Sequence, residues 1–177
     1  MIKYFSIFLI MLVVGWGSYW TVNRGFYPAA TVNYKIISAR NLENNYQSAL
    51  GYYVKIKKPE VSEQDLQKEI RRATLDKLIE NALIYEDVNS SDIESQLATI
   101  IQQNPNLEQG AVITYGVSWE VFKDLILRPQ IAAELLQKNL QDKNENLDNW
   151  LKNKKQSASI WVFSSGLRWS GERIEVN

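Results

Sequence analysis

The sequence predicts a mainly α-helical domain that is anchored at its N-terminus by a transmembrane helix and closed by a small two-stranded sheet. Apolar residues recur at helical spacing over most of the chain, whereas the alternation typical of strands is limited to residues 31–38 and 159–163. The residues from Tyr4 to Val22 carry no charge. We therefore expect an anchor followed by one domain over residues 31–177.

The N-terminal segment is long enough to cross a bilayer. As a helix, the 19 residues Tyr4–Val22 would span roughly 28 Å, close to the ~30 Å of the hydrocarbon layer. We predict that residues 1–24 form a retained single-pass anchor in the cell membrane, with the soluble domain on the extracytoplasmic side. Lys3 favours a cytoplasmic N-terminus, although Arg24 and Lys35 lie on the other flank. A cleaved signal peptide is the alternative, but its apolar region usually runs only about 7–15 residues.

The first strand and its partner come from distant parts of the chain. Residues 25–30 are expected to be a linker, and residues 31–38 a strand with alternate residues on one face, namely Val32, Tyr34 and Ile36. Isolated strands are marginal on their own. We therefore expect residues 32–37 to pair with residues 159–163 and so to close the domain.

Two helices follow the first strand. Ser38 is expected to cap the first helix, and Pro59 to end it. Ser62 is expected to begin the second helix, whose latter half, LIENALIY (78–85), is apolar on nearly every side. A helix of this kind must be surrounded by other elements. We predict that it is the central core helix and that other helices enclose it.

The next two helices are recognised by their ends. Ser91 and Glu94 have the spacing of a capping box, and Pro105 is expected to close the helix that they begin. A short helix over residues 107–115 is predicted to end at Gly116, because glycine readily adopts the left-handed conformation that terminates helices.

The last long helix is predicted to run from Trp119 to about Leu140, with Ser118 as its cap. Pro129 removes one backbone donor and is expected to kink it. The helical core would then cover residues 31–142. A closing segment over residues 145–177 would contribute a short helix and the second strand, with apolar residues at Leu147, Trp150, Leu151, Ile160 and Val162.

The composition argues against several classes of function. The chain has 177 residues, 20 basic and 20 acidic side chains, and neither cysteine nor histidine. A neutral chain has no overall field to attract nucleic acid, and the missing residues remove the common metal ligands and general bases. We expect no catalytic residues, no cofactor and no metal. An enzyme remains the least favoured reading, which a deep pocket with two facing carboxylates would revive.

Aromatic side chains are the candidates for binding. Tyr115, Trp119, Phe122 and Trp169 could line a groove for apolar peptide segments. Aromatic residues at helical or strand spacing are more often part of a core, so both roles stay open. Trp169 lies between glycine and serine residues, where a ring of this size needs a surface to cover it.

The order of these elements resembles a known family. After the N-terminal segment come VNYKIISARNLENNY, LDKLIENALIYEDV, SSDIESQLATII and YGVSWEVFKDLI. This series is similar to the N-terminal domain of the SurA-like periplasmic chaperones, a group that includes SurA, PrsA and PpiD. The matching features are the apolar Leu75, Leu78 and Ile79, the turn formed by Gly116 and Ser118, and Phe122 in the long helix. The resemblance covers roughly residues 31–142.

The resemblance implies a chaperone-like scaffold. Many members carry a parvulin prolyl-isomerase domain between the long helix and the closing segment, whereas here only residues 141–146 separate the two. We expect a membrane-anchored domain that binds unfolded or exported polypeptides without isomerase activity. The alternative is a structural or assembly subunit that binds one membrane-associated partner. The sequence leaves the client and the oligomeric state open.

Overall fold

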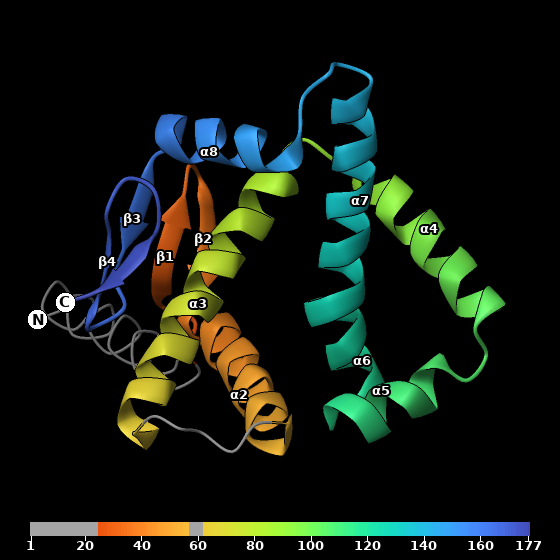
Figure 1. Ribbon diagram of the computed structural model, residues 1–177, viewed down its shortest axis with the longest axis horizontal. Helices are drawn as coiled ribbons and strands as arrows, with labels where there is room; N and C mark the ends of the chain where they lie inside the picture. Colours follow the sequence, from red (N-terminus) through yellow and green to blue (C-terminus); the bar gives the residue numbers. More distant parts are fainter. Residues whose placement is uncertain (1–24, 57–61) are drawn as a thin grey trace, which may run out of the picture.

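The computed structural model describes residues 25–56 and 62–177 and is mainly helical, with two small antiparallel sheets (Figure 1). The predicted anchor lies outside these residues, and none of the described helices is long and apolar enough to cross a membrane. The elements in chain order are β1 (Pro28–Val32), β2 (Lys35–Ser38), α2 (Ala39–Ile56), α3 (Glu63–Ile84), α4 (Ser90–Gln103), α5 (Leu107–Tyr115), α6 (Trp119–Phe122), the π-helical η1 (Lys123–Leu127), α7 (Arg128–Gln141), α8 (Leu147–Ser157), β3 (Ile160–Val162), β4 (Leu167–Trp169) and β5 (Ile174–Val176).

Helix α3 separates the molecule into two parts. In Figure 1 the strands lie on one side of α3 and α7 lies on the other, while α8 lies above the strands and reaches the upper end of α3. The first core joins the strands to α3 and contains the fully buried Leu75, Ile79 and Leu83. The second core joins α4 to α7 and includes Ile84 at the end of α3.

The predicted central helix is therefore present and begins where expected. The Ser62 hydroxyl accepts a hydrogen bond from the backbone N–H of Asp65, which caps α3. Leu75, Ile79 and Leu83 recur every four residues and form its fully buried stripe. The helix is not enclosed all round, however, because Leu78 on another face is only partly buried.

The N-terminal sheet differs from the prediction. Residues 31–38 are not one strand but parts of the hairpin β1–β2, with Asn33 in the left-handed conformation at φ 53°. The Asn33 side chain also donates to the Glu86 carboxylate at 3.0 Å and accepts from the Ser159 N–H at 3.0 Å. Asparagine tolerates this conformation, so the chain turns there and leaves Tyr34 fully exposed at the tip.

The predicted pairing of the two chain ends is present, but residues 30–32 rather than 32–37 pair with residues 160–162, and the sheet has one more strand. Strand β1 lies between β2 and β3, and Val32 is the partner of Ile160. Residues 25–30, which we expected to be a linker, belong to the domain instead. Pro28 begins β1, Ala30 is fully buried, and the Gly25 carbonyl accepts a hydrogen bond from the Arg40 N–H at 2.8 Å.

The hairpin β4–β5 was not predicted. Its strands are only three residues long, too short to give an alternation pattern. Tertiary contacts with α3 stabilise it: Arg72 donates to the Ile174 carbonyl at 3.1 Å, and Asp76 accepts from the Ile174 N–H at 3.3 Å. Trp169, expected in a loop, is the last residue of β4 and packs against the first core.

The helix ends follow the sequence with one exception. Gly116 ends α5 at φ 68°, and Ser118 caps α6, both as predicted. The capping box at Ser91 is wrong, because the Asn89 side chain caps the helix by accepting from the Ser91 N–H at 3.1 Å, and α4 begins at Ser90, two residues earlier than a cap at Ser91 requires. The Glu94 carboxylate, no longer needed at the cap, pairs with Arg128 instead.

The interruption expected at Pro129 is a π-helical segment. The Arg128 N–H donates to the Lys123 carbonyl, five residues back, so the helix widens by one residue just before the proline. Proline lacks the N–H that a regular α-helix would need here. The long helix therefore consists of α6, η1 and α7.

Candidate functional site

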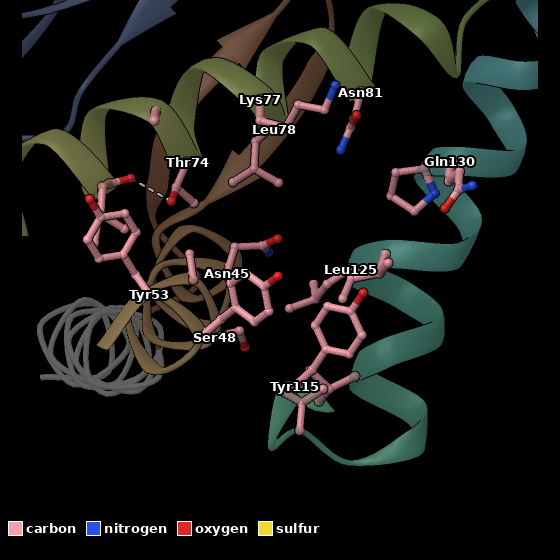
Figure 2. A pocket seen from close by; sticks show the side chains of 18 of the residues that line it. Asn45, Ser48, Tyr53, Thr74, Lys77, Leu78, Asn81, Tyr115, Leu125 and Gln130 are labelled. Atoms are coloured by element: carbon pink, nitrogen blue, oxygen red, sulfur yellow. Dashed lines mark hydrogen bonds between the residues drawn. The ribbon is translucent and has the colours of Figure 1, made fainter. Parts of the chain in front are cut away.

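An open groove of about 850 Å³ lies between α2, α3 and the combined η1–α7 helix. Figure 2 shows Leu78 of α3 and Leu125 of η1 pointing into the same space from opposite sides. Its size is within the range of about 300–1,000 Å³ typical of ligand sites. The lining residues are mostly apolar and come from all three walls, namely Asn45, Ser48, Ala49, Tyr52, Tyr53, Leu66, Glu69, Ile70, Ala73, Thr74, Lys77, Leu78, Asn81, Tyr115, Val117, Val121, Leu125, Ile126, Pro129, Gln130 and Ala133.

The α3 wall explains why this helix is apolar on more than one face. Ile70, Thr74 and Leu78 lie four residues apart and line the groove, whereas Leu75 and Ile79 face the first core. One side of the helix is therefore used for folding, and the adjacent side is left for the groove. The pattern LIENALIY contains both stripes.

The α2 wall is built in the same way. Leu42 and Tyr46 are buried, and the next stripe around the helix, Asn45, Ala49 and Tyr52, lines the groove. Ser38 fixes the start of this wall, since its hydroxyl accepts from the Asn41 N–H at 3.1 Å.

The opposite wall depends on the π-helical segment. Val121 precedes the segment, Leu125 and Ile126 lie within it, and Pro129 and Ala133 follow it, and all five line the groove. A π-helical turn changes the angular positions of the residues after it, so the apolar side chains before and after η1 reach the same wall. Such segments are often found at functional sites.

Most polar groups in the groove already have a partner. The Thr74 hydroxyl donates to the Ile70 carbonyl at 2.7 Å, and Lys77 pairs with Glu80 at 3.2 Å. The exception is Asn81, whose Oδ1 atom is buried and has no hydrogen-bond partner among the described residues. Because this oxygen is buried, it is not an accessible acceptor for a ligand in the groove.

Of the four predicted binding residues, only Tyr115 lines the groove. Its ring stacks on Tyr52 of α2, with the ring centroids 5.3 Å apart, and lies 5.1 Å from Phe122. Phe122 is buried in the second core, and Trp119 stacks on it at 5.9 Å. Phe122 therefore packs against Tyr115 and Trp119 packs against Phe122, whereas Trp169 packs against the first core.

Sequence reasoning missed the walls contributed by α2 and α3. The signal in the sequence is the all-round apolar character of LIENALIY, which predicts burial on every side. A second apolar stripe on a core helix can be buried by another helix or can line an open groove. The sequence alone does not distinguish these two arrangements.

A charged cluster holds α4 against the groove's outer wall. Arg128 forms a bidentate pair with the Glu94 carboxylate, at 2.7 and 3.1 Å, and also binds Asp124. The hydrogen bond from Arg128 lowers the pKa of Glu94 below its usual value. Nearby, burial raises the pKa of Tyr85 to about 12, so this phenol stays neutral in ordinary buffers.

The described residues contain no group of three or more side chains that could hold a metal ion. The groove itself contains only one carboxylate, Glu69, among its lining residues. The arrangement is therefore suited to non-covalent binding of apolar groups.

Comparison with known protein families assigns the chain to one of them. A family model described as the SurA-like N-terminal domain matches residues 1–115, about two thirds of the sequence. The chain belongs to this family. No curated protein and no solved structure matches it.

The SurA-like match covers part of the groove. Residues 1–115 include α2, α3 and Tyr115 at the end of α5, whereas η1 and α7 lie beyond it. Two of the three walls thus belong to the matched family region. The third wall follows the turn at Gly116.

Proposed function

We propose that this chain is a membrane-anchored, extracytoplasmic chaperone-like domain that binds unfolded or exported polypeptides in the groove. The single observation that carries the proposal is the open apolar groove on a SurA-like scaffold. Its mechanism would be the reversible burial of exposed apolar side chains of a client, with no covalent step.

The walls of the groove suit a flexible chain. Leu78, Leu125 and Ala133 offer aliphatic surface, and the stacked Tyr52 and Tyr115 offer flat rings. Apolar contact is non-directional, so it accepts many sequences.

The proposed absence of isomerase activity is supported by the connection between α7 and α8. Helix α7 ends at Gln141 and α8 begins at Leu147, which leaves five residues between them. A loop of this length cannot hold a further domain. A prolyl-isomerase assay on a proline-containing peptide checks this point, and turnover above the uncatalysed rate would contradict it.

The binding proposal is tested with two matched variants, each of which replaces one aliphatic residue by glutamine. Leu125→Gln removes an apolar side chain from the groove, and Ile113→Gln removes one from an exposed position of α5 outside it. Loss of a buried aliphatic contact of about 1.5 kcal/mol would weaken client binding roughly tenfold. The measurements are the affinity for an unfolded client and the suppression of its aggregation.

The control variant should behave like the wild-type protein in both measurements. If neither the wild type nor Ile113→Gln binds unfolded clients, the chaperone proposal is wrong. If crosslinking in membranes instead recovers one stoichiometric folded partner through Leu125, the chain is an assembly subunit that uses the groove as a fixed interface.

A further inference from the structure

The sheet formed by β2, β1 and β3 has an uncharged apolar outer face. Thr31 is the register partner of both Ile36 and Trp161, so these three side chains form one row across the sheet on the same face. Ile36 is 68% exposed and Trp161 is 65% exposed. The other face of the sheet, with Ala30 and Val32, packs against the first core.

Further aromatic rings are exposed just after β3 and just before β1. Phe163, two residues after Trp161, is 57% exposed, and its N–H donates to the Ala29 carbonyl at 2.8 Å, beside the start of β1. Phe26 and Tyr27, which lead into β1, are each about half exposed. Large exposed apolar side chains that gather on one face usually mark a contact with a protein or a membrane.

The position of the N-terminal segment favours a membrane. The uncharged stretch ends at Val22, only four residues before Phe26, so a fully extended chain between them covers at most about 14 Å. If residues 1–24 span a bilayer, Phe26 is held in or next to the headgroup layer. Tyrosine and tryptophan rings are enriched at that level in membrane proteins.

The basic residues near the start of the described chain also suit a position next to a membrane surface. Arg24 immediately precedes the described chain, and Arg40 lies over the Phe26 ring, 5.6 Å from its centroid. Basic side chains next to a membrane segment can pair with the phosphate groups of lipids. The apolar face itself, at positions 31, 36 and 161, has no charge to desolvate.

We propose that the outer face of this sheet, defined by Thr31, Ile36, Trp161 and Phe163, rests on the lipid surface to which the N-terminal segment attaches the domain. The groove lies on the other side of α3 from the sheet, as Figure 1 shows for its wall α7. Docking through the sheet would therefore keep the groove facing the aqueous phase, where clients arrive. This inference rests on the predicted anchor and not on chaperone activity.

The absence of cysteine makes a direct test possible. Single substitutions Ile36→Cys and Phe163→Cys place a nitroxide label on the sheet face, and Ala98→Cys places it on the exposed face of α4 as a control. The full-length chain is reconstituted into vesicles of phosphatidylcholine and phosphatidylglycerol. Collision of the label with oxygen, which partitions into lipid, is compared with collision with a water-soluble nickel chelate.

We expect oxygen collisions to dominate at positions 36 and 163 and nickel collisions to dominate at position 98. Nickel collisions dominating at all three positions would overturn the proposal. Labels at position 36 that are shielded from both reagents and broaden each other's spectra would show that a second copy covers the face, which also overturns it. If the chain does not float with vesicles, the membrane proposal is also overturned. That result would say nothing about client binding by the groove, which is tested separately.

Discussion

A comparison of two leucines on α3 tests how this helix divides folding from binding. Leu75 is fully buried in the first core, whereas Leu78, three residues later, is partly buried and lines the groove. The variants Leu75→Ala and Leu78→Ala remove the same atoms from the same helix. One variant should therefore mainly lower the stability of the fold, and the other should mainly lower the affinity for clients.

The expected magnitudes follow from burial. Leu75→Ala leaves a cavity in a closed core and should lower the free energy of unfolding by about 3 kcal/mol. For a domain of this size, that corresponds to a melting temperature lower by about 6–12 °C. Leu78→Ala opens onto the groove, where water replaces the lost side chain, so its effect on stability should be about 1 kcal/mol.

Client affinity should show the opposite order. Leu78→Ala removes a contact surface and should weaken binding by about tenfold, while Leu75→Ala should leave the affinity of the folded protein unchanged. Stability is measured by urea unfolding followed by tryptophan fluorescence, and affinity by fluorescence anisotropy of a labelled unfolded client at a temperature where both variants are folded. Equal losses of stability in the two variants, or unchanged affinity in Leu78→Ala, would refute the division of α3 into a core stripe and a groove stripe.

Three further predictions concern the scaffold. The pKa of Glu94 is lowered by Arg128, so this pair stabilises the fold fully above the carboxyl's ordinary value of 4.5, and the contribution disappears as the pH falls through the lower folded value. Urea midpoints measured from neutral to acidic pH should therefore fall less for Glu94→Gln than for the wild type, and parallel curves would contradict this. Gly116→Ala should destabilise the protein by about 1 kcal/mol because φ is 68° there, and a calorimetric melting temperature equal to that of the wild type would argue against a left-handed residue. A fragment of residues 25–177 should show a cooperative thermal transition at higher temperature than one of residues 31–177, which lacks most of β1; identical transitions would mean that this strand contributes nothing to stability.

The local features of the fold could be read from the sequence because their physical causes are local. A serine cap such as Ser62 or Ser118 acts on backbone N–H groups three residues away, and Gly116 acts through its own φ angle. The π-helical interruption before Pro129 follows from one missing backbone donor. The SurA-like family assignment, which rests on the order of such features, was also correct.

The errors arose where two candidates competed locally and a distant contact decided between them. Asn89 and Ser91 are both residue types that cap helices well. The Glu94 side chain, which would complete a capping box with Ser91, instead pairs with Arg128 of α7. Asn33 turns the chain into a hairpin and holds that turn through Glu86 and the backbone of Ser159. These partners are far away in the sequence, and no short pattern contains them.

The sequence by itself determined the helical class, most helix boundaries and the family, because these depend on periodicity and on interactions within one turn. Only the tertiary structure decided which apolar stripe of α3 is core and which lines the groove, and that Tyr115 lines the groove while Phe122 is buried next to it. It also decided that Ile36 and Trp161 lie on the same exposed sheet face, on either side of Thr31. The physical reason is that an apolar side chain has the same local pattern whether it is covered by its own domain or left for a partner. What covers it depends on where distant elements pack.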